Sequence, residues 1–172
     1  MNKEWLKYVL VMIVAFMLDS CISYFLPFDY GKSAITIVPC IGLMMFMLLN
    51  NTVDNEFQYV FAVIVGAYYA IIYANSLAIY VLLYVVFSFF GRQYTKLSTF
   101  SIFESFLIFA LTIFVQLSVV YWLMKGTGIT SIGVISFIYQ RLLPSLLFNM
   151  ILTIPVFFVH KKLGFEVKVN AH

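Results

Sequence analysis

The chain has 172 residues, of which 64% are apolar and 10% are charged, and its formal net charge is +3. Soluble proteins contain about 45–50% apolar and about 25% charged residues. This composition excludes a soluble enzyme, a disordered tail, a nucleic-acid binder and a disulfide-stapled secreted domain. We therefore predict an integral membrane protein in which residues 1–172 form one membrane domain.

Six segments are expected to cross the membrane as α-helices, because each is continuously apolar and each is separated from the next by a break. In chain order they are residues 8–26, 34–49, 57–73, 77–90, 102–124 and 142–159. Short breaks, such as Gly91-Arg92-Gln93, make consecutive helices antiparallel neighbours. The predicted fold is therefore all-α, a compact bundle of six transmembrane helices.

The distribution of basic residues predicts the orientation. Lys3, Lys7, Arg92, Lys96, Lys161, Lys162 and Lys168 flank one side of the predicted bundle, whereas Lys32, Lys125 and Arg141 flank the other. Lys and Arg accumulate on the cytoplasmic side of membrane proteins. We therefore expect both termini to be cytoplasmic.

Three strongly polar side chains lie inside the apolar segments at a similar predicted depth, slightly outside the midplane. They are Asp19 in the first segment, Gln116 in the fifth and Asn149 in the sixth. Hydrocarbon would leave them unsatisfied, so we expect them to face the bundle interior and form hydrogen bonds there. Ser20, Ser23 and Ser118 are further candidates for this layer. Two interpretations stay open: a structural clamp that fixes helix register, and a polar cavity or docking seat for a partner helix.

Capping residues and prolines give local predictions. Ser101 and Glu104 have the spacing of a capping box at the start of the fifth helix. Pro39 is expected in the outer part of the second helix, and Pro144 is expected to kink the sixth helix near its outer end. Residues 130–140 either extend the sixth helix outward or lie along the outer interface.

The sequence argues against an enzyme. Intramembrane hydrolysis needs a nucleophile with a base, or a metal with its ligands. Asp19 is the sole deep acid, and neither His160 nor His172 has an acidic or cysteine companion at metal-ligand spacing. Cys21 and Cys40 lie in apolar runs and are expected to pack as small hydrophobic residues. We predict no catalytic, cofactor-binding or metal site, and no cofactor.

Residues 141–149 read RLLPSLLFN, with Pro144 and Asn149 five residues apart. Together with Val38-Pro39 at the second apolar run and Gly66 in the third, this pattern resembles the MreD family of rod shape-determining membrane proteins. The resemblance implies a non-enzymatic component of the bacterial cell-elongation machinery in the inner membrane. It further implies association with MreC and, through it, with MreB and with the RodA and penicillin-binding-protein synthases of peptidoglycan.

The alternative is the substrate-binding S component of an energy-coupling-factor vitamin transporter, whose six-helix fold the MreD family is thought to share. S components commonly carry a pair of small residues four apart on the first helix. Here Ala15 is followed four residues later by Asp19, which counts against that function. The residues expected to matter most for a partner or for the polar layer are Asp19, Gln116, Asn149 and Pro144.

Overall fold

The described part of the chain is built from helices. The computed structural model describes residues 3–26, 35–53, 57–73, 77–95 and 101–165, and no strand occurs among them. The elements in chain order are α1 (Lys3–Phe25), α2 (Ile41–Asn50), α3 (Gln58–Tyr73), α4 (Leu77–Thr95), α5 (Ile102–Gly126), α6 (Val134–Phe137), the π-helical turn η1 (Ile138–Leu142) and α7 (Leu143–Lys162). The all-α prediction is confirmed.

Three helices are long and apolar enough to cross a membrane. They are Trp5–Phe25, Ile102–Gly126 and the continuous helix Val134–Lys162. At 1.5 Å per residue, each reaches about 30 Å or more, which is the thickness of a hydrocarbon core. Shorter apolar helices cover Gln58–Ile72 and Ala78–Gln93. The lengths and apolar composition of these helices therefore indicate a membrane protein.

The second predicted crossing is not a single helix, so the prediction of a helix from residue 34 to residue 49 is wrong in its first part. Residues 35–40 are extended, and α2 begins only at Ile41. Pro39 therefore precedes the helix, because proline disfavours a helical conformation in the residue before it. Six extended residues span about 20 Å and the ten residues of α2 about 15 Å, which together match a bilayer core of about 30 Å.

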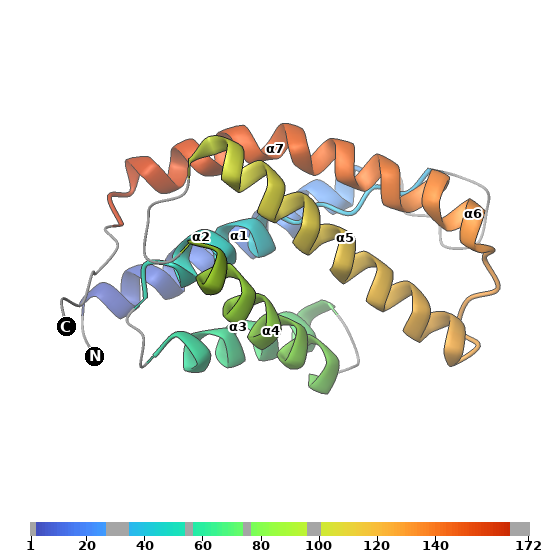
Figure 1. Cartoon of the computed structure of the whole chain (residues 1–172), viewed down its shortest axis with the longest axis horizontal. Coiled ribbons are helices and arrows are strands. Elements are labelled where there is room, and N and C mark those ends of the chain that lie inside the picture. The colour runs from blue at the N-terminus through green and yellow to red at the C-terminus, as the bar shows by residue number, and fades with distance from the viewer. Residues whose placement is uncertain (1–2, 27–34, 54–56, 74–76, 96–100, 166–172) are drawn as a thin grey trace.

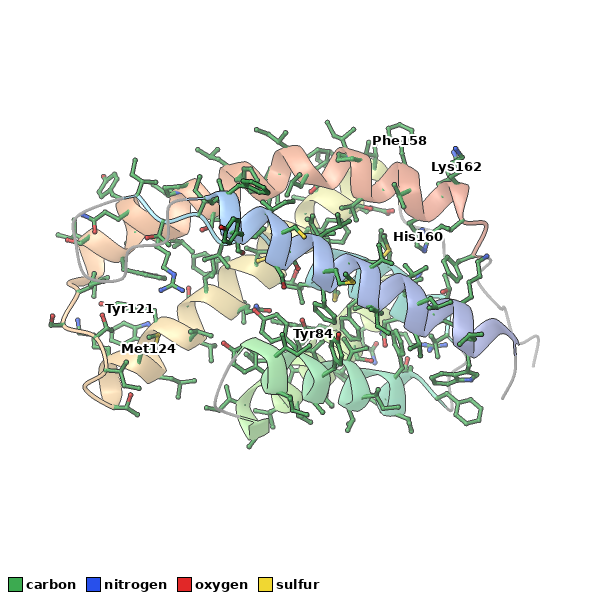
Figure 2. All side chains as sticks on the ribbon, turned by 180° about the vertical axis from the view of Figure 1, so that it is seen from behind. Tyr84, Tyr121, Met124, Phe158, His160 and Lys162 are labelled. Atoms are coloured by element: carbon green, nitrogen blue, oxygen red, sulfur yellow. The ribbon has the colours of Figure 1, made fainter. Side chains whose placement is uncertain are left out.

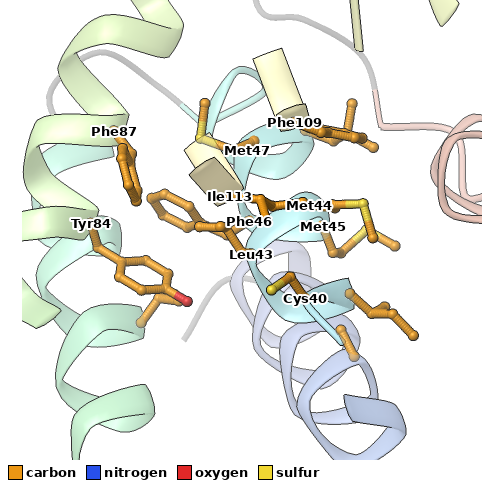
Figure 3. Packing of buried hydrophobic residues seen from close by; sticks show 14 of the residues in the cluster. Cys40, Leu43, Met44, Met45, Phe46, Met47, Tyr84, Phe87, Phe109 and Ile113 are labelled. Atoms are coloured by element: carbon orange, nitrogen blue, oxygen red, sulfur yellow. The ribbon is translucent and has the colours of Figure 1, made fainter. Parts of the chain in front are cut away.

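Helix α2 is the centre of the bundle. All of its residues are buried, and Figure 3 shows their side chains packing toward several neighbouring helices. The ring of Phe46 lies 4.8 Å from that of Tyr84 and 5.7 Å from that of Phe61. A helix that is apolar on every side is stable only when other elements surround it. Helix α2 satisfies this condition because α1, α3, α4, α5 and α7 all contact it.

Helices α3 and α4 form a hairpin on one side of α2 (Figure 1). Gly66 lies where these two helices approach most closely. A Cβ atom at position 66 would lie 2.9 Å from the Cα of Val81 and 3.1 Å from the carbonyl oxygen of Tyr80. Any side chain at this position would therefore push the hairpin apart.

Helix α4 continues to Thr95, so the turn predicted at residues 91–93 is wrong. Gly91 fits inside the helix because it packs against α2, where a Cβ atom would lie 2.8 Å from the Cε of Met47. Arg92 donates a hydrogen bond from Nη1 to the Oε1 of Gln58 in α3. These two contacts anchor the last turns of α4 to its neighbours.

Two predictions concern the starts of the fifth and sixth predicted spans. The capping box is present: the backbone N–H of Ser101 donates to Glu104 Oε2 at 2.7 Å, and the N–H of Glu104 donates to Ser101 Oγ at 3.2 Å. Helix α6, η1 and α7 form one continuous helix from Val134. Of the two alternatives for residues 130–140, outward extension of the last helix is therefore confirmed from Val134 onward.

Helix α1 begins and α7 ends at the same end of the bundle (Figure 1). Lys7 Nζ donates to the carbonyl oxygen of Leu163 at 2.5 Å and lies 4.4 Å from the centre of the Phe165 ring. His160 stacks on the same ring at 5.7 Å, and Figure 2 places it between α7 and α1. This arrangement agrees with an even number of crossings.

Candidate functional site

The extended residues 35–40 lie inside the bundle, where their backbone polar groups need partners. Water is absent from a bilayer core, and each unpaired backbone group there costs several kcal/mol. Helices solve this problem within their own segment, but an extended segment cannot. The structure solves it with side chains of α1 and α7 and with one carbonyl of η1, which we call the clamp: Asp19, Ser145, Asn149 and the carbonyl of Gln140.

Asn149 supplies the largest share of the clamp. Its Oδ1 accepts the N–H of Cys40 at 2.8 Å, and its Nδ2 donates to the carbonyl of Val38 at 2.8 Å and to the carbonyl of Ser145 at 2.7 Å. The Oγ of Ser145 accepts the N–H of Val38 at 3.0 Å. Asn149 and Ser145 are both fully buried. Between them they pair with both neighbours of Pro39, a residue that has no N–H to satisfy.

Asp19 caps the N-terminus of α2 from another helix. Its two carboxyl oxygens accept the N–H groups of Ile41 and Gly42, each at 2.7 Å. The residue at the cap position itself, Cys40, makes no such bond with its side chain. The first N–H groups of a helix lack partners within the helix and form its positive end, so a carboxylate is a favourable partner there. Both carboxyl oxygens of Asp19 thus have hydrogen-bond partners inside the bundle, where they stabilise the start of α2.

Gly42 makes this approach possible. A Cβ atom at position 42 would lie 3.1 Å from Asp19 Oδ2 and would overlap the ring of Phe16. Glycine therefore allows α1 to come close enough for its carboxyl group to reach the α2 backbone. The sequence carries no sign that Gly42 differs from other glycines.

Pro144 acts through the backbone. In an α-helix the carbonyl of residue 140 would accept the N–H of residue 144, but proline has none. The N–H of Leu143 instead bonds to the carbonyl of Ile138, as in a π turn. The carbonyl of Gln140 is then available and accepts the N–H of Thr36 at 2.8 Å. Pro144 therefore contributes to the clamp by freeing an acceptor at the outer end of the extended segment.

Gln116 is buried and forms a hydrogen bond inside the bundle, as expected, but it does not join the clamp. Its Nε2 lies 3.4 Å from the hydroxyl of Tyr69, which packs 5.8 Å from the ring of Phe16. Its Oε1 is buried without a hydrogen-bond partner in the part of the chain that is described. Ser20 also stays outside the clamp, since its hydroxyl bonds to the carbonyl of Phe16 in its own helix.

The clamp side chains bond to backbone groups of the chain itself. Among the described residues no three His, Cys, Asp or Glu side chains lie together as metal ligands would. Ser145 was missed in the sequence analysis, although its spacing of four from Asn149 places both on one helix face. No family model, curated protein or solved structure matches this chain.

Proposed function

We propose that this chain is a non-enzymatic scaffold of the bacterial cell-elongation machinery, similar to MreD. In this proposal it crosses the inner membrane six times, keeps both termini in the cytoplasm, and binds the transmembrane helix of an MreC-like protein. Through that partner it would act with MreB and with the RodA and penicillin-binding-protein synthases.

One observation carries the proposal: four of the residues on which the resemblance rests, Val38, Pro39, Pro144 and Asn149, come together in space. Asn149 binds the backbone on both sides of Pro39, at Val38 and Cys40, and Pro144 frees the carbonyl that binds Thr36. Val38-Pro39 and the Pro144–Asn149 pair are more than 100 residues apart in the chain. These contacts explain why the sequence pattern has these residues at these positions, which supports a fold shared with the MreD family.

The clamp also supports a scaffold. Both oxygens of Asp19, and the oxygen and both N–H donors of Asn149, bond to the chain's own backbone. The structural interpretation of these two residues is thus favoured over a ligand cavity between them. A protein whose mass lies largely in apolar helices presents mainly helix faces, and partner helices bind such faces through close packing and polar contacts.

Depletion of the protein from the cell that makes it tests the proposal. We expect depleted cells to lose their elongated shape and become rounded, and re-expression to restore it. Asn149→Leu should fail to restore shape, whereas Thr153→Val, one helical turn away, should restore it. Cells that keep their shape after complete depletion would contradict the proposal.

Gln116 favours a second candidate, an S component of a vitamin transporter. Its buried Oε1 lacks a hydrogen-bond partner among the described residues, and such an atom suits a polar ligand. Purified protein that binds a water-soluble vitamin at nanomolar concentration, and loses it on Gln116→Leu, would establish this function. Rounded cells after depletion without any vitamin binding would reject it.

A further inference from the structure

An apolar groove runs between α1 and α7 on the face shown in Figure 2. Its flanks are formed by residues 10–22 of α1 and residues 152–163 of α7, and its floor by Ile41 and Met45 of α2. The groove has a volume of about 470 Å³. Every residue that lines it is apolar. It is therefore a cavity of ligand size, open to the surrounding hydrocarbon.

The length of the groove identifies which kind of apolar occupant fits. Residues 10–22 cover twelve helical steps, or about 18 Å. One leaflet contributes about 15 Å to the hydrocarbon core, whereas a transmembrane helix needs about 30 Å. Toward the other leaflet, the extended residues 35–40 are bound to α7 by Ser145 and Asn149. The groove is therefore too short for a whole transmembrane helix and long enough for one acyl chain.

Basic side chains lie at the end of the bundle where α1 begins and α7 ends. Lys7 lies three residues before Leu10 and seven before Val14, so it shares their helix face. Lys162 lies three residues after Val159 and is exposed at the end of α7 (Figure 2). At this end, the charged side chains described on α1 and α7 are Lys7, Lys161 and Lys162, all positive.

Lys7 is held in place at this end. Its Nζ donates one hydrogen bond to the carbonyl of Leu163 and lies above the ring of Phe165. An ammonium group has three donors, so two remain for an anion. A positively charged end beside an apolar groove of this length is complementary to a phosphate group attached to an acyl chain.

We propose that this groove binds an anionic glycerophospholipid from the leaflet on the side of the chain termini. One acyl chain lies between α1 and α7 on the floor formed by Ile41 and Met45, and the phosphate group contacts Lys7 and Lys162. The lipid joins the first helix to the last. This site is independent of the scaffold proposal, because it rests on the groove and the lysines alone.

Lipid binding to the purified full-length protein, measured by native mass spectrometry, tests the proposal. The probes are phosphatidylglycerol and phosphatidylcholine with identical acyl chains. We expect phosphatidylglycerol to bind about tenfold more tightly, in keeping with two lysines near the headgroup. Lys162→Gln should reduce this preference several-fold without disturbing the Lys7 contact, whereas Lys162→Arg should retain it. Lys125→Gln, at the far end of α5, is the matched control and should change nothing.

A second pair of variants tests the acyl-chain part of the site. Val14→Trp places an indole in the groove and should weaken binding of both lipids. Ile151→Trp, on the exposed face of α7 outside the groove lining, should not. Equal affinity of the wild type for the two lipids would overturn the proposal. So would Val14→Trp variants that bind lipid normally but lose self-association or a partner helix.

Discussion

Asn149 and Asp19 replace, for residues 38–42, the backbone hydrogen bonds that a helix would supply from within. These hydrogen bonds matter for stability mainly because, without them, buried backbone groups would be left unpaired. Removing one partner of a buried hydrogen bond costs about 1–3 kcal/mol for each group left unsatisfied. The two side chains together pair with four backbone groups of this segment: Val38 O, Cys40 N, Ile41 N and Gly42 N.

Asn149→Leu should destabilise the protein by about 2–5 kcal/mol, because it leaves the Cys40 N–H without a partner and the Val38 carbonyl with only the Cys40 thiol at 3.6 Å. In detergent, the apparent melting temperature should fall by roughly 4–20 °C. Thr153→Val is the control: Thr153 bonds to the carbonyl of Asn149 within its own helix, so its loss leaves no segment unpaired. Equal effects of the two substitutions would contradict the role given to Asn149.

Asp19→Leu should also destabilise the protein, and Asp19→Asn should have a smaller effect. The amide keeps one oxygen that can accept the N–H of Ile41 or of Gly42, but not both. Thermal melting of the three proteins in one detergent measures the order. An Asn variant as unstable as the Leu variant would show that the negative charge matters more than the hydrogen bonds.

Among the elements, the continuous helix from Val134 to Lys162 depends on a local irregularity for its contact with the extended segment. The π turn Ile138–Leu142 and Pro144 together leave the Gln140 carbonyl free to accept the Thr36 N–H. π turns of this kind often occur at functional sites. Here the irregularity fixes the outer end of the second crossing.

Pro144→Ala restores an N–H that can pair with the Gln140 carbonyl inside the helix. We expect the π turn to relax and the amide of Thr36 to exchange its hydrogen faster. The amides of Cys40 and Ile41, which Asn149 and Asp19 hold, should keep their protection and serve as the internal control. Hydrogen exchange measured by mass spectrometry checks this, and unchanged exchange at Thr36 would contradict it.

Gly66→Val should destabilise the α3–α4 hairpin by about 1–3 kcal/mol, the usual cost of forcing extra carbon atoms into a packed contact. The new side chain would meet the backbone of Val81, which cannot rotate away. Gly133→Ala is the control, since nothing lies within 4 Å of a Cβ atom there. Thermal melting of both variants tests the expectation, and similar melting temperatures would count against close packing at Gly66.

The sequence predicted helices well where their stability is local and poorly where it depends on distant partners. The starts of α5 and α3 lie at or next to the predicted residues, 102 and 57, because apolar runs with clear boundaries define them. The helix predicted from residue 34 failed because Asn149 and Asp19 stabilise an extended backbone that no local pattern indicates. The interior location of both side chains followed from the cost of burying polar groups. Their targets did not, since these are backbone atoms of a segment expected to be helical.

At the scale of the whole molecule, the first and last helices approach each other at one end of the bundle. The contact from Lys7 to Leu163 joins these two helices, and α2 lies between them as the floor of the groove. The apolar composition of α2 predicted its burial but not its central position, which depends on how all the other helices pack around it. Topology is therefore the property of the whole bundle that most needs a direct measurement.

Labelling of intact membrane vesicles with a membrane-impermeant reagent tests the arrangement. Tags at the two termini should react from the same side, and from the cytoplasmic side if the distribution of basic residues governs insertion. A cysteine introduced at Thr127, exposed after the end of α5, should react only from the opposite side. Termini that react from opposite sides would rule out an even number of crossings.

The broken second crossing also sets an order for biosynthesis. The ribosome makes residues 36–42 long before it makes Gln140, Ser145 and Asn149, which lie about a hundred residues later. Until the last helix has entered the bilayer, the carbonyl of Val38 and the amides of Thr36, Val38 and Cys40 have none of these native partners, a state that lipid does not tolerate. In the proposed six-crossing topology, the nascent chain would hold this stretch near water, or shield it in the insertion machinery, and complete its second crossing only after its last.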